Sequence, residues 1–276
     1  MSLCVTRAAM SEPQCARPAA PIGRSGRLAG KRALVTGAGS GIGRGIALAF
    51  AAHGARVFGA DLRAAAALET QCVADEQGAP LAGTSAADVT DPRAVRALVD
   101  AANECLGGID VLVTAAATAV FAPIEDLAYE DWQLTLRAEL DSVFLCCKAA
   151  WPLLKRQGGS IINFASANAY LTLEGSPALA HCAGKGGVLA MTRQLALEGA
   201  PHGIRANTIS PGMIRTGATA ALLMDPAFSE TVLRHAMIKR VGAPEDIAWC
   251  AIFLASDESA WITAADINVD GGATAL

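Results

Sequence analysis

The chain has 276 residues, of which 53% are hydrophobic and 17% are charged. This length and composition allow a sizeable buried core and are typical of one large folded domain rather than a disordered chain. The formal net charge is −4, and no segment is dense in lysine or arginine. Nucleic acid would find no basic surface to bind, so we expect no nucleic-acid partner.

Membrane-spanning and metal-binding proteins are disfavoured too. The longest uncharged apolar stretch, residues 111–124, has roughly 14 residues, fewer than the ~20 that a membrane-spanning helix needs. The eight cysteines are scattered, with no Cys-x-x-Cys pair and no histidine-rich segment beside them. We therefore expect reduced thiols, no metal site, no membrane partner and a cytoplasmic location.

Residues 1–27 predict a disordered tail ahead of the folded domain, residues 28–276. The tail contains three prolines, four arginines and one acidic residue, and it lacks the apolar segment of a secretory signal. An organelle-targeting segment, or a true start at Met10, would account for it as well.

From Lys31 onward, short aliphatic runs alternate with longer alanine-rich segments of helical period. This alternation is typical of strand–helix–strand units, and runs that are apolar on both faces indicate a parallel sheet covered by helices on both sides. The sequence predicts a single α/β domain with a doubly wound, seven-stranded parallel sheet, the Rossmann fold. The strands are expected at residues 33–36, 56–60, 81–84, 111–114, 160–164, 205–209 and 267–269.

Helix starts and one long excursion complete the predicted architecture. Asp91 followed by Pro92 opens one helix, and residues 243–246 open another with early acids. The segment 216–240 is expected to lie over the carboxyl ends of the strands as a substrate lid. Its apolar residues favour a hydrophobic alcohol, ketone or ring diol, although they could instead cap the core or contact a neighbouring subunit: Ala220, Leu222, Leu223, Met224 and Phe228.

A glycine-rich turn at residues 36–43 follows the first predicted strand and leads into an apolar helix. Glycines allow the backbone to approach a pyrophosphate closely, and the amino end of the helix offers N–H groups to that anion. The strand before the turn and the helix after it favour dinucleotide binding over a plain turn. The expected contacts here are Gly37, Ser40, Gly41, Ile42 and Gly43.

Asp61 stands at the end of the second predicted strand, about 24 residues after Gly37. Its carboxylate can accept hydrogen bonds from the adenosine ribose, and its charge would repel a 2′-phosphate, so we expect NAD rather than NADP. The alternative is a surface aspartate that starts the next helix. Arg44 is the one basic residue that could favour NADP, and we expect it to face solvent.

From Gly30 to Gly272 the sequence resembles the one-domain short-chain dehydrogenase/reductase family. Residues 36–43 match the family's T-G-x-x-x-G-x-G, residues 88–89 match its adenine-flanking pair, residues 211–216 match its P-G-x-x-x-T loop, and residues 269–272 match its C-terminal strand and turn. The resemblance implies NAD binding and a homotetramer packed through the fourth and fifth long helices, at residues 143–145 and 188–191. The resemblance also implies further cofactor contacts, of which Leu62 directly follows Asp61. These contacts are Leu62, Asp88, Val89, Ala115, Lys185, Pro211, Gly212, Ile214 and Thr216.

The resemblance also locates a catalytic site, which departs from the family pattern. Ser166 matches the serine that orients the substrate oxygen, and Lys185 matches the lysine. The tyrosine four residues before the lysine is His181 here, and the relay asparagine is Glu139. Residues 114–117 read T-A-A-A in place of N-N-A-G, so amide hydrogen bonds that steady the sheet and frame the cofactor are expected to be missing.

Histidine in place of tyrosine changes the expected chemistry. Tyrosine has a reference pKa near ~10 and imidazole one near ~6.5, so a neutral imidazole is a competent base and a poor acid near neutral pH. Lys185 would favour the neutral imidazole, while Glu139 could oppose that effect by pairing with either residue, and the net sign stays open. We expect Ser166, His181, Lys185 and Glu139 to oxidise a secondary alcohol. Tyr170, in the loop after Ser166, could reach the substrate from another direction.

Two alternatives to a dehydrogenase remain open. One is a lyase, isomerase or dehalogenase that uses His181 as a base without net redox change. The other is a catalytically inactive subunit that binds NAD, since both the tyrosine and the asparagine of the family are absent.

Overall fold

Seven parallel strands form one sheet in the order β3-β2-β1-β4-β5-β6-β7. The computed structural model describes residues 26–276. The strand order reverses between β1 and β4, and in such sheets ligands bind beyond the carboxyl ends of the strands at this switch point. The strands are β1 (Arg32–Thr36), β2 (Arg56–Asp61), β3 (Gly83–Ala86), β4 (Val111–Thr114), β5 (Gly159–Phe164), β6 (Ile204–Pro211) and β7 (Asp266–Val269).

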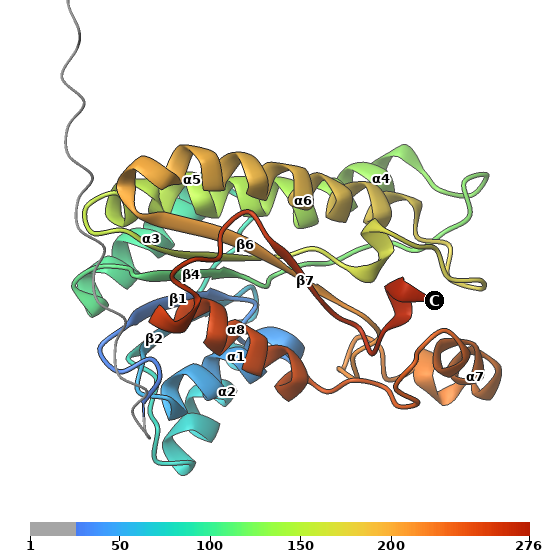
Figure 1. Cartoon of the computed structure of the whole chain (residues 1–276), viewed down its shortest axis with the longest axis horizontal. Helices are drawn as coiled ribbons and strands as arrows, with labels where there is room; N and C mark the ends of the chain where they lie inside the picture. The colour runs from blue at the N-terminus through green and yellow to red at the C-terminus, as the bar shows by residue number, and fades with distance from the viewer. Residues whose placement is uncertain (1–25) are drawn as a thin grey trace, which may run out of the picture.

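Helices cover both faces of this sheet (Figure 1), as expected for strands that are apolar on both sides. One core cluster packs α1 and α8 against the sheet, and the other packs α3, α5 and α6 against its opposite face. The helices are α1 (Gly41–Ala52), α2 (Ala64–Glu76), α3 (Pro92–Leu106), α4 (Tyr129–Leu136), α5 (Ser142–Leu154), α6 (Leu179–Gly199), α7 (Pro226–Arg234) and α8 (Pro244–Ala255).

The predicted fold is confirmed, and all seven strands lie where the sequence places them to within two residues. The third begins at Gly83 instead of Leu81 because Phe58 of β2 pairs with Gly83. Leu81 is buried, so the hydrophobic peak in the sequence marks a core contact just ahead of the strand. The expected helix starts are also confirmed, since the Asp91 carboxylate accepts a hydrogen bond from the Arg93 N–H at the start of α3.

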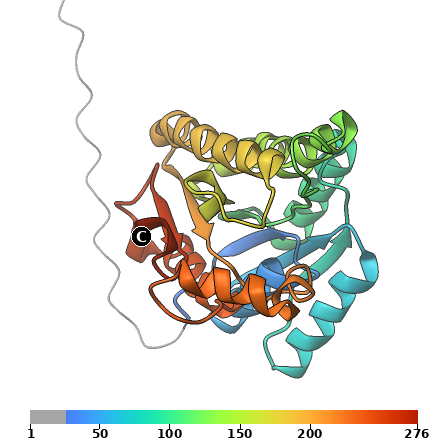
Figure 2. The ribbon, with the colours of Figure 1, turned by 90° about the vertical axis from the view of Figure 1, so that its right-hand side faces the viewer.

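The excursion at residues 216–240 contains α7, which lies beyond the carboxyl ends of the strands. Figure 2 looks toward this end of the sheet and shows α7 in front of it. The same region also carries the turn at residues 222–224. The segment is therefore placed where a lid over a bound substrate would lie.

The runs expected at a subunit contact are used largely within the chain. Val143, Val188 and Leu189 are buried, the first two in the core against the sheet. Phe144, which lies on another side of α5, is about half exposed at 48%. The hydrophobic runs are therefore explained mainly by the two-sided covering of the sheet.

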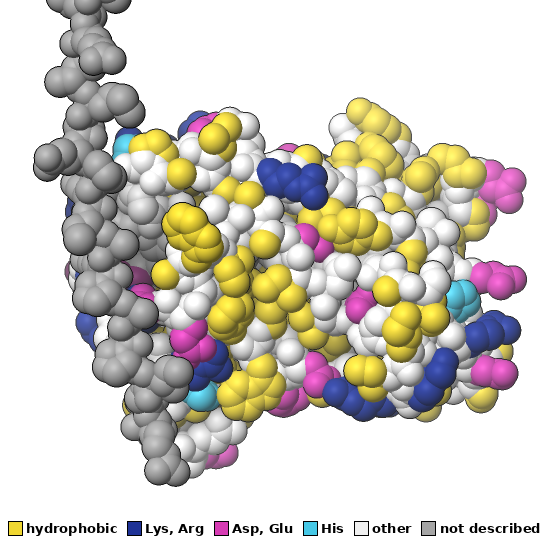
Figure 3. Space-filling view, in the orientation of Figure 1, with side chains coloured by type: hydrophobic (Ala, Val, Ile, Leu, Met, Phe, Trp, Pro, Cys, Tyr) yellow, Lys and Arg dark blue, Asp and Glu magenta, His cyan; other side chains and the backbone are white. Residues whose placement is uncertain are grey.

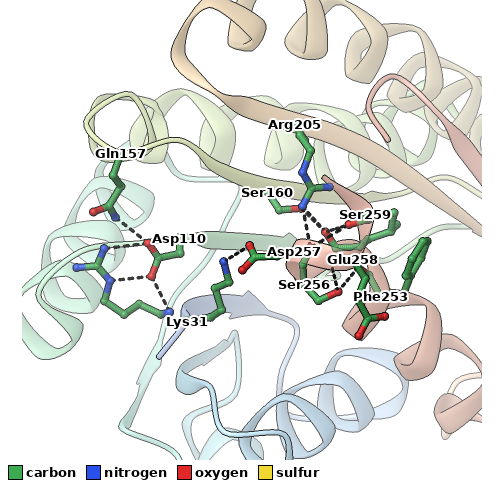
Figure 4. Close-up of polar contacts among 12 residues, drawn as sticks. Lys31, Asp110, Gln157, Ser160, Arg205, Phe253, Ser256, Asp257, Glu258 and Ser259 are labelled. Carbon is green, nitrogen blue, oxygen red and sulfur yellow. Dashed lines mark hydrogen bonds and ion pairs between the residues drawn. The ribbon is translucent and has the colours of Figure 1, made fainter. Parts of the chain in front are cut away.

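At the amino end of the sheet, charged side chains tie neighbouring segments together (Figure 4). Arg32 of β1 forms a bidentate ion pair with Asp110, which precedes β4, and Gln157 donates to the same carboxylate. Lys31 pairs with Asp257 beyond α8. These contacts join segments far apart in the sequence and lie at the end of the sheet opposite the switch-point crevice.

The predicted tail, residues 1–27, lies outside the described residues except for Gly26 and Arg27. Arg27 forms an ion pair with Glu258, and the next residue, Leu28, is fully buried. Across residues 26–276, the helices are too short or too polar to cross a membrane.

Candidate active site

The glycine-rich turn leaves no space for side chains where β1, β4 and α1 meet. A Cβ at Gly37, whose φ is +67°, would lie 2.8 Å from the Ala115 carbonyl oxygen, and a Cβ at Gly43 would clash with the Gly37 carbonyl. A Cβ at Gly41 would lie 3.1 Å from the Thr216 side chain, so this turn and the loop after β6 face each other closely. These close approaches fit the backbone cradle that a dinucleotide needs.

The amino end of α1 points into this cradle. Ser40 precedes the helix in an extended conformation, is exposed, and makes no capping hydrogen bond. The first N–H groups of a helix have no partner inside it and attract anions. Ile42, in the first turn, packs partly against the core behind the cradle. The residues at this helix end therefore fit a pyrophosphate group.

Asp61 lies beside the cradle with its carboxylate fixed by backbone groups. One oxygen accepts from the Gly39 N–H and the other from the Arg63 N–H, each at 3.0 Å. The carboxyl carbon would lie 2.6 Å from a Cβ at Gly39, so the two residues are in close contact. The negative charge is thus held next to the glycine-rich turn, where it fits an adenosine ribose with free hydroxyls.

The sequence led us to expect that Arg44 faces solvent, but the structure shows its guanidinium bonded to other groups of the protein. Its guanidinium donates to the Gly39 carbonyl and to the Thr70 hydroxyl, and it pairs with Glu69. These contacts engage the charge with the glycine-rich turn and with α2.

The other predicted cofactor contacts surround the same crevice. Leu62 is exposed beside Asp61, and the Asp88 carboxylate accepts from both the N–H and the hydroxyl of Thr90. Val89 and Ala115 each pack partly against the core.

The loop after β6 supplies the remaining predicted contacts. Pro211 ends the strand, and the Gly212 N–H bonds to the Val269 carbonyl. Ile214 is buried against Gly242, so any cofactor contact by Ile214 comes from its backbone. The Thr216 N–H bonds to the Thr219 hydroxyl, which closes the loop over the cradle.

Asn163, which was not among the predicted site residues, supplies amide hydrogen bonds next to β4. Asn163 of β5 is fully buried; its carbonyl oxygen accepts from the Thr114 hydroxyl and its NH₂ donates to the Thr192 hydroxyl. The Ala116 N–H bonds to the Thr36 hydroxyl. A polar asparagine inside an otherwise apolar strand is the sequence signal that could have revealed this bridge.

Ser166, His181 and Glu139 lie in one hydrogen-bonded series. His181 Nδ1 is 2.8 Å and 3.0 Å from the two carboxylate oxygens of Glu139, and its Nε2 is 3.3 Å from Ser166 Oγ. An ionised carboxylate only accepts hydrogen bonds, so this network assigns the proton to Nδ1 and leaves Nε2 as the acceptor. The imidazole therefore presents its basic nitrogen to Ser166.

Local backbone geometry explains how Glu139 reaches the histidine. Residues 137–141 form a π-helical turn between α4 and α5, and the Ser142 hydroxyl bonds back to the Ala138 carbonyl. π-Helical turns are rare and concentrate at functional sites. Gly184 faces Glu139 from α6, where a Cβ would come within 3.2 Å of the carboxylate. The missing side chain makes room for the carboxylate, which is 2% exposed.

Lys185 completes the cluster from the next position on α6. Its Nζ donates to the Phe164 carbonyl at 3.1 Å and lies 3.8 Å from Glu139. Burial lowers the pKa of Lys185, and attraction to Glu139 only partly offsets that effect. The ammonium group thus places positive charge beside the carboxylate that holds His181.

Two aromatic side chains near the cluster have different roles from one another. Phe121, half exposed in the loop after β4, stacks at a tilt on His181 with ring centroids 5.6 Å apart. No pattern in the sequence indicates this contact, because Phe121 lies in a loop without periodicity. Tyr170 does not reach toward the substrate: its hydroxyl donates to Asp266 of β7, and burial together with that contact raises its pKa to about 12.

A cavity of about 430 Å³ lies between the loop after β6, α7 and the C-terminal segment. Ala167 and Asn168, which directly follow Ser166, line one wall. Most of its other side chains are apolar, with a few polar groups at intervals, as is typical of small-molecule sites. Among the lining residues are Leu171, Met213, Val232, His235, Ile238 and Asn268. Within residues 26–276, no cluster of three or more His, Cys, Asp or Glu side chains has the arrangement of a metal site.

Comparisons with known proteins agree with this geometry. The family model described as enoyl-(acyl carrier protein) reductase matches residues 37–274. D-threitol dehydrogenase of Mycolicibacterium smegmatis is 41% identical over 251 residues, covering 90% of this chain and 94% of that protein. Galactitol 2-dehydrogenase (L-tagatose-forming) of Cereibacter sphaeroides is 37% identical, covering 90% and 96%. The crystal structure of a gluconate 5-dehydrogenase from Burkholderia cenocepacia with NADP and tartrate superposes with a TM-score of 0.85 at 32% identity, covering 91% and 97%.

Proposed function

The chain belongs to the short-chain dehydrogenase/reductase family of oxidoreductases, and from that premise we propose that it oxidises a secondary alcohol with NAD and uses His181 as the general base. The observation that carries this proposal is the hydrogen-bonded series from Glu139 through His181 to Ser166. It orients an imidazole with its basic nitrogen toward the serine that the family uses to hold the substrate oxygen.

The cradle at the carboxyl end of β1 would hold the cofactor. Gly37, Gly41, Gly43 and the amino end of α1 would bind the pyrophosphate, and Asp61 would bind the adenosine ribose. Bound NAD supplies the acceptor for the hydride that leaves the alcohol carbon. The fixed charge of Asp61 supports NAD over NADP, although the gluconate 5-dehydrogenase relative binds NADP.

Proton removal falls to His181. A substrate hydroxyl bound at Ser166 would lie within reach of His181 Nε2, which accepts the proton as the carbon–oxygen bond becomes a carbonyl. Ser166 Oγ already accepts from the Asn168 N–H, so its own O–H is the group that can turn toward His181 or the substrate oxygen. Ser166 thus orients the substrate oxygen rather than taking its proton.

Glu139 and Lys185 prepare His181 for this step. The Glu139 carboxylate holds the Nδ1–H and stabilises the imidazolium that forms when Nε2 takes a proton. Lys185 is farther from Glu139 than the imidazole is. Its Nζ lies 3.8 Å from Glu139 Oε1, whereas His181 Nδ1 lies 2.8 Å from the same oxygen. Glu139 thus makes the direct hydrogen bond to the imidazole, and Lys185 places its charge near the same carboxylate.

The substrate is expected to carry its alcohol on a largely apolar body. Most side chains that line the cavity are apolar, and the charged ones are Arg240, Asp246 and Asp270. The named substrates of the two curated relatives, threitol and galactitol, are instead polyols. A panel that contains both kinds of alcohol separates the two possibilities.

We also expect a homotetramer in the cytoplasm. Apolar side chains gather over the face on which β7 and α8 lie (Figure 3). Trp249 of α8 is 57% exposed, and Trp261, which precedes β7, is fully exposed. Phe144 adds an exposed aromatic ring on α5. Every cysteine among residues 26–276 is a free thiol, which suits a reducing compartment. Analytical ultracentrifugation of the full chain would measure the oligomeric state.

The test is NADH formation with a panel of secondary alcohols, ring diols and polyols, for the wild type and for His181→Ala. The proposal expects turnover with NAD and little with NADP, and its loss in His181→Ala while calorimetry still detects NAD binding. Turnover of a substrate without NADH formation would instead support a lyase or isomerase, and NAD binding without any turnover would support a binding subunit.

A further inference from the structure

The order of groups in the active site is that of a nucleophilic relay. A carboxylate holds one ring nitrogen of a histidine, and the other ring nitrogen faces a serine hydroxyl. Such a constellation is identified by geometry and roles on whatever fold it occurs. We propose that Ser166, His181 and Glu139 also transfer the acyl group of an activated ester to water, without any cofactor.

Each of the three groups is suited to its part. Glu139 is 2% exposed and contacts Nδ1 through both oxygens, so the imidazole cannot turn its ring without losing them. The distance of 3.3 Å between Nε2 and Ser166 Oγ is at the long end for a hydrogen bond and is typical of a nucleophile and base before substrate binds. Nothing in this arrangement requires a nicotinamide ring.

Ser166 is also open to a ligand. It is partly exposed, and its neighbours Ala167 and Asn168 line the cavity of about 430 Å³. The Asn168 N–H occupies one lone pair of Oγ, and the hydroxyl proton is left to His181. An ester bound against this wall of the cavity would approach Ser166 from the side of Ala167 and Asn168.

The reaction balances without an oxidant or a reductant. Ser166 Oγ forms a bond to the ester carbonyl carbon while its proton passes to His181 Nε2. The bond from that carbon to the leaving oxygen breaks, and the leaving group takes the proton from His181. Water then attacks the acyl-serine, giving its proton to His181, and the carboxylic acid leaves as Ser166 recovers its proton.

A tyrosine at position 181 could not act in this way, because an un-ionised phenol is not a base near neutral pH. The activity is therefore tied to the exchange of tyrosine for histidine. General-base assistance contributes roughly 10²–10⁴-fold to such a step. An ester with a good leaving group is the appropriate probe, since its departure needs little further help.

The experiment measures hydrolysis of p-nitrophenyl acetate by the full chain without nucleotide. We expect Ser166→Ala and His181→Ala each to lower the rate by roughly 10²-fold or more, and Glu139→Gln to lower it by roughly 10-fold or more. His202→Ala and Ser85→Ala, at partly buried positions in other elements of the fold, serve as matched controls with unchanged rates.

Two further readouts separate this proposal from the dehydrogenase. Peptide mass spectrometry after a short reaction should find the acetyl group on Ser166, and His181→Tyr should lose ester hydrolysis while NAD-dependent alcohol oxidation continues. Hydrolysis that survives Ser166→Ala and His181→Ala, or acetylation only at lysines, would overturn the proposal. Neither result would bear on alcohol oxidation, which is measured separately through NADH. Circular dichroism of every variant distinguishes a lost fold from a lost site.

Discussion

At the amino end of the sheet, Arg32 pairs with Asp110, and about a fifth of each side chain is exposed. At the carboxyl end, Glu139 is almost fully buried between His181 and Lys185. Both carboxylates are hydrogen-bonded. The Arg32–Asp110 pair joins β1 to the residue that precedes β4. The second carboxylate holds a histidine whose other ring nitrogen faces Ser166, and the residues after Ser166 line a cavity. We infer that the amino end serves stability and the carboxyl end serves chemistry.

A buried charge is stabilised differently at the two ends, as the pKa values of Asp110 and Lys185 show. Burial acts to raise the pKa of Asp110, but hydrogen bonds and attraction from Arg32 outweigh it and hold that pKa below its usual value. For Lys185, burial prevails and lowers the pKa despite the attraction of Glu139. The charged form of Asp110 is therefore favoured at the amino end. At the carboxyl end, burial disfavours the charged form of Lys185.

The largest effect should follow from removing the base at the carboxyl end. His181→Ala is expected to lower kcat for alcohol oxidation by roughly 10²–10⁴-fold, because a positioned general base contributes about that much. Initial rates of NADH formation measure it. His181→Ala also leaves the buried Glu139 carboxylate without this hydrogen-bond donor, so urea unfolding is measured to show that the variant remains folded. His202→Ala is the control, and equal losses in both variants would break the contrast.

Next in size is the expected change in cofactor choice. Asp61→Asn keeps the shape of the side chain and removes the charge that would repel a 2′-phosphate. We expect kcat/KM with NADP, relative to NAD, to rise roughly 10- to 100-fold. Asp75→Asn, on the surface of α2, should leave the ratio unchanged. An unchanged ratio in Asp61→Asn would show that another residue sets the preference.

A smaller effect, on stability alone, is expected at the amino end. Asp110→Asn should lower the free energy of unfolding by about 1–2 kcal/mol near neutral pH, a charge-assisted hydrogen-bond value reduced for partial exposure. Turnover should be unchanged. Urea unfolding followed by circular dichroism measures the difference, and a loss of activity with intact stability would contradict the assignment of this end.

The same variant should show a pH dependence with a defined sign. Because the folded-state pKa of Asp110 is lowered, its contribution is present above the unfolded-state value, about 3.9, and is lost as the pH falls through the lower folded-state value. The stability difference between the wild type and Asp110→Asn should therefore narrow on acidification below about pH 4. A difference that widens there would refute the origin of the shift.

The smallest expected effect tests the fit of Glu139. Gly184→Ala adds a Cβ that would lie 3.2 Å from the carboxylate, so the carboxylate must move by a few tenths of an ångström. We expect kcat to fall several-fold, while a better helix residue offsets the strain and keeps stability within about 1 kcal/mol. Gly186→Ala, with open space around it, should gain helix stability without losing activity.

The sheet and the cofactor cradle could be predicted because local patterns encode them. Two-sided apolar strands, the glycine-rich turn at residues 36–43 and Asp61 each carry their role within a few residues of sequence. Strand β3 begins two residues later than expected. Leu81 is buried ahead of the strand, and the pairing with β2 begins only at Gly83. Register depends on the partner strand, which a local pattern does not contain.

The catalytic cluster could be predicted only in part. The family resemblance indicated Ser166, His181, Lys185 and Glu139, but the pairing of Glu139 with His181 depends on a π-helical turn and on Gly184. The sequence therefore left open which partner Glu139 would take. Phe121 and Asn163 were missed because their roles arise from contacts between segments far apart in the chain.

The central claim is that His181 removes the alcohol proton, and the pH profile of kcat/KM for alcohol oxidation in the wild type and in His181→Tyr tests it most directly. We predict that the wild-type activity rises with pH as a base in the site loses its proton, and that in His181→Tyr the rise moves to more alkaline pH, because a phenol is a much weaker acid than an imidazolium. The same rise in both proteins would contradict a histidine base and assign proton removal to another group.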